Sequence, residues 1–277
     1  MKRGHGPLLV FAAIGLVTGI TLSQIACRTP ASGPSTAAMN TLATHEGYEL
    51  FAAHCAPCHG ATGGGRGPAA IALSVAPRDF WHERFRYVST LNGVPTEEDL
   101  IQSIRYGRRF GEMPANPQLT DTELRTLARY IREIQRLGWL DVLREEFAGD
   151  EDTSPDELEE ISHIRVRPRE PIHVARPERG FRRDLDTGRE LYAANCASCH
   201  GLTGRGDALD KPLDERGKPI SVRNLTSGEF RGGAKVEEIF KRIRCGVPGT
   251  PMSAAVALTD EEVWQLVYYV RYLAGRT

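Results

Sequence analysis

Two segments of this chain carry nearly the same sequence, and this repeat restricts the chain to folds in which each copy forms a separate domain. Gly47–Gly60 and Gly188–Gly201 are identical at 10 of 14 positions, and the second segment starts 141 residues after the first. Leu119–Ile131 is repeated as Leu258–Val270, 139 residues later. A solenoid needs at least three repeats, because each unit buries its apolar face against a neighbour. Two copies of roughly 95 residues must instead close two separate cores.

The first residues have the composition of an export signal. Lys2 and Arg3 precede an apolar stretch from Leu8 to Ile20, and the next charge is Arg28. We therefore expect the domains to fold on the periplasmic face of a membrane and to stay anchored to it. Two anchors fit the sequence: a lipid on Cys27, which ends a sequence resembling a lipoprotein cleavage site, or an uncleaved apolar helix.

Composition also divides the rest of the chain. Residues 28–43 are rich in Ala, Ser, Thr, Pro and Gly, which predicts a flexible tether. Residues 141–183 contain twelve acidic and eight basic residues with four prolines, which predicts a charged linker with one extended segment near Ile164–Val174. The expected organisation is an anchor or signal peptide at 1–27, a tether at 28–43, a first domain at 44–140, a linker at 141–183 and a second domain at 184–277.

The periodicity within each domain is helical. In the first domain, apolar spacing predicts helices from about His45 to Ala53, from near Thr96, and from Thr120 to Leu137 before Gly138. Three helix starts have capping-box sequences, which are Thr96 with Asp99, Thr120 with Glu123 and Thr259 with Glu262. No stretch alternates convincingly as a strand. The expected fold class is all-α, with two small helical bundles and long loops.

Each repeat contains Cys-x-x-Cys-His, the motif that attaches c-type haem. One turn of chain brings two thiols to the porphyrin vinyl groups, and the histidine that follows is the proximal iron ligand. A zinc ribbon has its ligand pairs about 15–20 residues apart, and a redox-active cysteine pair requires no histidine after it. The sequence therefore predicts two covalently bound haem c groups. Their attachment and proximal ligand residues are Cys55, Cys58 and His59 in the first repeat and Cys196, Cys199 and His200 in the second.

The methionines indicate the sixth iron ligands. The chain has four: Met1 is the initiator and Met39 lies in the expected tether, which leaves Met113 and Met252, one in each repeat. Both stand in a loop rich in Gly and Pro between the second and third helices, where a residue that only fills a core is uncommon. Thioether ligation favours reduced iron and raises its potential.

Each repeat resembles a class I cytochrome c domain, and the two copies cover nearly all of residues 44–275. The resemblance implies that the first helix crosses the last, through a glycine and an aromatic residue four positions later. The contacts it implies are Gly47 and Phe51 with Tyr130, and Gly188 and Tyr192 with Tyr269.

Other residues are candidates for the haem surroundings. Arg78 and Arg223 precede short polar-aromatic runs, and each is either a partner for a haem propionate or a solvated surface residue. Cys245 has no obvious cysteine partner and is expected to be a buried small residue near the second haem. Three aromatic residues either line the haem pockets or pack in the core, and they are Trp81, Tyr87 and Trp264.

Together these features favour an electron carrier rather than an enzyme. A haem iron with both axial positions filled has no open site for a substrate, so single electrons pass through the haem edge. A dihaem peroxidase is the enzymatic alternative, but it needs two unlike halves; a subunit of a larger oxidoreductase complex is a further alternative. The net charge of −1 gives no basic face for nucleic acid. The expected partners are respiratory redox proteins and the membrane.

Overall fold

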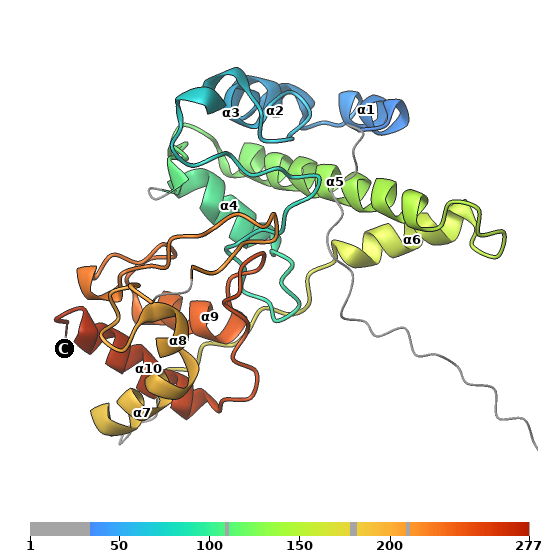
Figure 1. Ribbon diagram of the computed structural model, residues 1–277. Helices are drawn as coiled ribbons and strands as arrows, with labels where there is room; N and C mark the ends of the chain where they lie inside the picture. The colour runs from blue at the N-terminus through green and yellow to red at the C-terminus, as the bar shows by residue number, and fades with distance from the viewer. Residues whose placement is uncertain (1–33, 109–110, 178–181, 209–210, 277) are drawn as a thin grey trace, which may run out of the picture.

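The computed structural model describes residues 34–108, 111–177, 182–208 and 211–276, which form two helical lobes (Figure 1). The helices of the first lobe are α2 (Tyr48–His54), α3 (Ala56–His59), η1 (Pro68–Ala72), α4 (Glu97–Tyr106) and α5 (Asp121–Glu146). Those of the second lobe are α7 (Leu185–Asn195), α8 (Ala197–His200), η3 (Leu225–Ser227), α9 (Val236–Cys245) and α10 (Asp260–Leu273). Extended pairing in the described residues is limited to three isolated bridges. The all-α prediction is confirmed.

In each lobe the first helix crosses the last through a glycine. A Cβ atom added to Gly47 would lie 2.6 Å from Cβ of Tyr130, and one added to Gly188 would lie 2.9 Å from Cβ of Tyr269. The aromatic residue one turn later then meets the same tyrosine, with ring centroids 5.1 Å apart in the first lobe and 5.3 Å in the second. The crossings that the family resemblance implied are therefore present in both lobes.

The three capping boxes form as predicted. In each, the threonine hydroxyl accepts from the backbone N–H three residues later, and the acidic side chain there accepts from the threonine N–H. Such reciprocal bonds satisfy two helix N–H groups that have no partner within the helix. They fix the starts of α4, α5 and α10.

The predicted end of the third helix at Gly138 is wrong, because α5 continues to Glu146. Gly138 lies inside the helix, where a Cβ atom would come within 2.2 Å of the Trp81 carbonyl oxygen. This glycine therefore permits a close approach of the chain around Trp81 to α5. A glycine that serves packing and one that ends a helix look the same in sequence.

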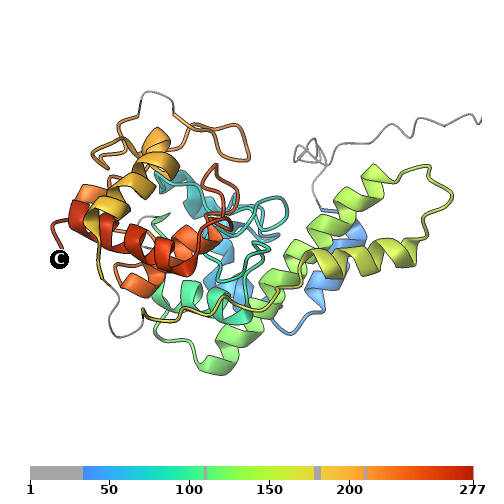
Figure 2. The same cartoon turned by 90° about the horizontal axis from the view of Figure 1, so that it is seen from below.

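Part of the predicted tether and linker is also helical. Helix α1 (Thr36–Ala43) lies within residues 28–43 and packs on α5 with Ala38 and Leu42 buried. Helix α6 (Pro155–Arg165) lies within residues 141–183 and packs back along α5. These segments bury apolar surface on the extended part of α5, so they are ordered by tertiary contacts. Figure 2 shows α5 and α6 projecting as a hairpin away from the second lobe.

The chain leaves α6 as an extended segment that follows the first lobe before it enters the second. Pro171 forms an antiparallel bridge with Thr90, and the N–H of Ile172 donates to the Ser89 carbonyl over 2.7 Å. The extended segment predicted in the linker is thus found after Arg165. The predicted anchor at 1–27, with Cys27, lies outside the described residues, and within them no helix is long and apolar enough to cross a membrane.

Candidate haem sites

The two Cys-x-x-Cys-His motifs fold into the same single turn, α3 in the first lobe and α8 in the second. The first cysteine ends the preceding helix and starts this turn, so its carbonyl accepts from the N–H of the histidine. That bond is 2.8 Å long between Cys55 and His59, and 2.9 Å between Cys196 and His200. Each motif therefore presents its thiols and imidazole together, as covalent haem attachment requires.

The cysteines lie in surroundings unlike those of a reactive thiol pair. Burial raises the pKa of Cys55 to about 12 and that of Cys196 to about 11, and the second cysteine of each motif adds to the rise. A redox-active Cys-x-x-Cys pair lowers the pKa of its attacking thiol instead. A thioether, which has no proton to lose, suits this apolar environment. The donor set therefore fits haem c better than a thioredoxin-like pair.

Both histidines are oriented by a backbone carbonyl. The Nδ1 atom of His59 lies 3.0 Å from the Arg78 carbonyl oxygen, and that of His200 lies 3.2 Å from the Arg223 carbonyl oxygen. A carbonyl only accepts, so Nδ1 carries the proton and Nε2 keeps its lone pair for a metal. Burial lowers the pKa of both histidines, which favours the neutral form that coordinates iron. The site thus fits an iron ligated through Nε2.

Arg78 in the first site and Arg223 in the second take part through the backbone carbonyl oxygen, which the sequence analysis did not consider. The sequence left each side chain as either a propionate partner or a solvated surface group, and the structure brings the backbone carbonyl of each to the histidine of its motif. The side chain of Arg78 forms an ion pair with Glu83 and lies 3.6 Å from Glu215 of the second lobe. Any residue type supplies a carbonyl, so only the equivalent placement in both repeats could have indicated this role.

The methionine loops of the two lobes also share one backbone geometry. A glycine follows the last residue of each preceding helix, Gly107 after α4 and Gly246 after α9, with φ of 65° and 67°. The next residue donates its N–H to the carbonyl of Met113 or Met252, over 2.8 Å in both cases. Met113 packs against the first core, and Met252 is 37% exposed. The loops thus hold the two methionines in corresponding positions.

The remaining candidates divide between core and interface. Trp81 and Trp264 are buried among the core residues of their lobes. Tyr87 lies where the lobes meet. The centroid of its ring is 4.1 Å from Cζ of Arg108 in the first lobe and 5.7 Å from Cζ of Arg242 in the second. Cys245 is buried as predicted, and burial raises the pKa of its thiol to about 11.

One aromatic contact was missed at the sequence level. Phe80 stacks on the imidazole of His59, with ring centroids 4.5 Å apart and planes within 19°. The same ring also stacks on Phe85 at 5.7 Å. This aromatic pair supports one face of the histidine. The clue was a phenylalanine two residues after Arg78, although nothing in the sequence showed which ring it would meet.

Comparisons with known proteins agree with this geometry. Residues 42–131 and 183–270 each match the family model described as cytochrome c oxidase, cbb3-type, subunit III. The chain is 25% identical over 239 residues to the cbb3-type cytochrome c oxidase subunit FixP of Azorhizobium caulinodans, covering 85% of this chain and 61% of that protein. It is 34% identical over 107 residues to the cbb3-type subunit CcoP of Rubrivivax gelatinosus, covering 37% of this chain and 31% of that one.

A solved structure shows the same arrangement over most of the chain. It comes from the reducing HAO-like protein complex of Kuenenia stuttgartiensis, with a TM-score of 0.66 and 29% sequence identity. The match covers 83% of this chain and 96% of the other. By contrast, the chain spans about three fifths of the length of FixP and about a third of CcoP.

Proposed function

Because the chain belongs to the family of cytochrome c oxidase, cbb3-type, subunit III, for which haem-based electron transfer is the implied function, we propose that it relays single electrons between respiratory redox partners. Two covalently bound haem c groups carry the electrons. Cys55 and Cys58 attach the first and Cys196 and Cys199 the second. Bound haem supplies an iron that is reversibly reduced by one electron.

The observation that carries this proposal is the repetition of both ligand positions. His59 and His200 keep Nε2 available through the same carbonyl contact, and Met113 and Met252 stand in loops of the same geometry. Ligation by both residues leaves no open position for peroxide or oxygen at either iron. Outer-sphere electron exchange is the chemistry that such a pair of sites supports.

Membrane anchoring belongs to the same proposal. Helix α1 begins at Thr36 and packs directly on α5, so an anchor on Cys27 or within residues 1–27 would hold the first lobe close to the membrane surface. The export-like start of the sequence supports a periplasmic location for both lobes. Membership of an oxidase complex is supported by the names of the two relatives, both of which are oxidase subunits.

Mass spectrometry and spectroscopy of the exported protein test the proposal together. We expect the added mass of two haems, low-spin iron in both oxidation states, and a weak near-infrared band from sulfur-to-iron charge transfer. Met113→Leu and Met252→Leu should each remove about half of that band and lower one potential, because each variant loses one thioether. A high-spin haem in the unmodified protein, or rapid consumption of peroxide, would favour a dihaem peroxidase instead.

A further inference from the structure

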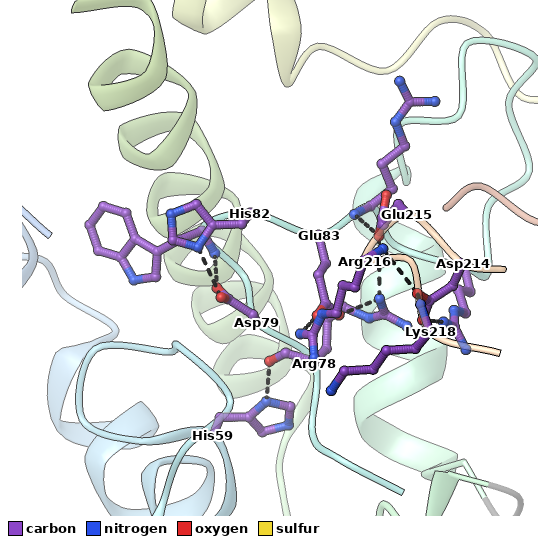
Figure 3. Close-up of polar contacts among 12 residues, drawn as sticks. His59, Arg78, Asp79, His82, Glu83, Asp214, Glu215, Arg216 and Lys218 are labelled. Atoms are coloured by element: carbon purple, nitrogen blue, oxygen red, sulfur yellow. Dashed lines mark hydrogen bonds and ion pairs between the residues drawn. The ribbon is translucent and has the colours of Figure 1, made fainter. Parts of the chain in front are cut away.

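A short turn of the second lobe, Leu213–Pro219, inserts its charged side chains against the first lobe. Leu213 and Pro219 form an antiparallel bridge, and the Asp214 carboxylate accepts from the N–H groups of Arg216 and Lys218 over 2.9 and 3.0 Å. The turn is thus fixed within its own lobe. Figure 3 shows its side chains gathered beside Arg78, with His59 on the other side of that arginine. We call residues 213–219 the interface turn.

Glu215 is the residue of the interface turn that reaches the first haem site. Its carboxylate accepts from the N–H of Arg84 over 3.0 Å and lies 3.6 Å from the Arg78 guanidinium. The Glu215 side chain is 13% exposed, so water screens these contacts less than it would at the surface. The carbonyl of that same Arg78 accepts from His59. One intervening residue therefore separates Glu215 from the proximal histidine.

Two flanking ion pairs hold Glu215 in register. Asp214 pairs with Arg86 over 3.3 Å, and Arg216 pairs with Glu83, which is buried and also contacts Arg78. The charges of the interface turn therefore complement those of the facing loop. Such complementarity fixes register between two surfaces more than it adds affinity.

On its other side, Glu215 meets the loop that presents Met252. The N–H of Glu215 donates to the Gly249 carbonyl over 3.1 Å. A Cβ atom on Gly249 would lie 2.6 Å from the Glu215 carboxylate, so the two are in close contact. Gly249 stands in the turn from Val247 to Thr250, and the Thr250 hydroxyl accepts from the N–H of Met252 over 3.2 Å. Glu215 thus supports the methionine loop of the second lobe.

We propose that Glu215 is a positioning residue that links the proximal histidine of the first haem to the methionine loop of the second, so that one carboxylate sets both potentials. This inference rests on the proposed function, because it takes His59 and Met252 as iron ligands. The contacts run from His59 through Arg78 to Glu215, and from Glu215 through Gly249 to the loop of Met252.

The test replaces the carboxylate with its uncharged isostere, Glu215→Gln, and follows both haems in a spectroelectrochemical titration. Each potential is assigned by repeating the titration in a Met113→Leu background. We expect both midpoint potentials to rise, because removing a negative charge that contacts the surroundings of both proposed ligands, His59 and Met252, would favour the reduced form of each iron. Glu215→Asp should return both potentials toward their original values. Glu237→Gln is the matched control, since Glu237, on α9 of the second lobe, also pairs with an arginine, Arg176, and it should move neither potential.

A shift of one haem alone, or an equal shift in the control, would overturn the link. Should Glu215→Gln fail to accumulate, Gly249→Ala keeps every charge but crowds the carboxylate, and it should alter both potentials; a change confined to the second haem would again refute the proposal. Failure of the proposed function gives a different result. In that case the unmodified protein would not carry two haems, or it would lack the sulfur-to-iron band. If the unmodified protein has both, but Glu215→Gln does not shift the two potentials together, then only the proposed role of Glu215 is refuted.

Discussion

Gly107 and Gly246 offer the sharpest test of the two methionine positions, because each can be substituted while both proposed ligands, Met113 and Met252, are kept. Both residues end a helix at a φ near 65° and a ψ beyond −160°, a region that is essentially restricted to glycine. A Cβ atom on Gly107 would lie 2.4 Å from the Met113 carbonyl oxygen, and one on Gly246 would lie 2.5 Å from that of Met252. Alanine at either position therefore pushes on the methionine itself.

The size of the effect follows from two additive costs. An alanine in this backbone region costs about 1–3 kcal/mol, and forcing a methyl group into closed packing costs a further 1–3 kcal/mol or so. The atoms in the way are backbone atoms of the methionine loop, so a side-chain rotation cannot relieve the contact. Movement of the loop is the available relief, and it withdraws the thioether. The cysteines and the histidine of each motif stand in a separate turn, so a haem that they bind would stay attached.

We expect Gly107→Ala and Gly246→Ala each to retain two haems by mass but to lose about half of the sulfur-to-iron charge-transfer band. Gly111→Ala is the matched control in the same loop as Met113. Among the described residues, the nearest atom to its added Cβ would be Cβ of Arg108, at 3.6 Å, so the band should be unchanged. Full intensity in both test variants would show that the glycines do not control the ligand loops.

Three further results are expected. Gly138→Ala should lower the free energy of unfolding by about 1–3 kcal/mol, since the Cβ would lie 2.2 Å from the Trp81 carbonyl oxygen; unchanged thermal unfolding would contradict this contact. Arg136→Met should weaken the packing of α6 on α5 and lower the free energy of unfolding by about 1–3 kcal/mol, because it removes a buried guanidinium that is bonded to Glu159. Limited proteolysis should then cut the variant faster than the unmodified protein in the segment after α5, and an equal rate of cleavage would contradict the prediction. Cys27→Ser should move the protein from the membrane pellet to the soluble fraction if a lipid is the anchor, and continued pelleting would identify an apolar helix instead.

Features set by a few neighbouring residues could be predicted from the sequence. The capping boxes depend on two side chains three positions apart, so Thr96 with Asp99 specified the start of α4 without reference to the rest of the fold. The Cys-x-x-Cys-His turn is equally local. The family resemblance added long-range information, because it implied the crossing of α2 with α5 and of α7 with α10 through a glycine and an aromatic residue that stand alike in both copies.

Features set by packing between distant segments could not be predicted in this way. Residues 28–43 have the composition of a tether, yet Leu42 is almost completely buried because the extended half of α5 offers it an apolar face. The sequence predicts a helix end at Gly138, because it does not show that Trp81 approaches this glycine. The contact of Arg78 with His59 is made by the backbone carbonyl. Every residue type has that group, so the sequence cannot indicate the contact.

One of the places where the two repeats differ in length explains how two similar lobes come to form an asymmetric pair. Nineteen positions separate His59 from Arg78, whereas twenty-three separate His200 from Arg223. The histidine-to-carbonyl contact is kept in both lobes, so the four extra residues lie in the connecting loop, and that loop contains the interface turn. Because Glu215 on this turn contacts Arg78 across the boundary, the longer loop of one lobe reaches the site of the other. Duplication alone would give two equivalent domains. The longer loop of the second lobe makes them unequal, because it adds a contact through which only the second lobe reaches the site of the first.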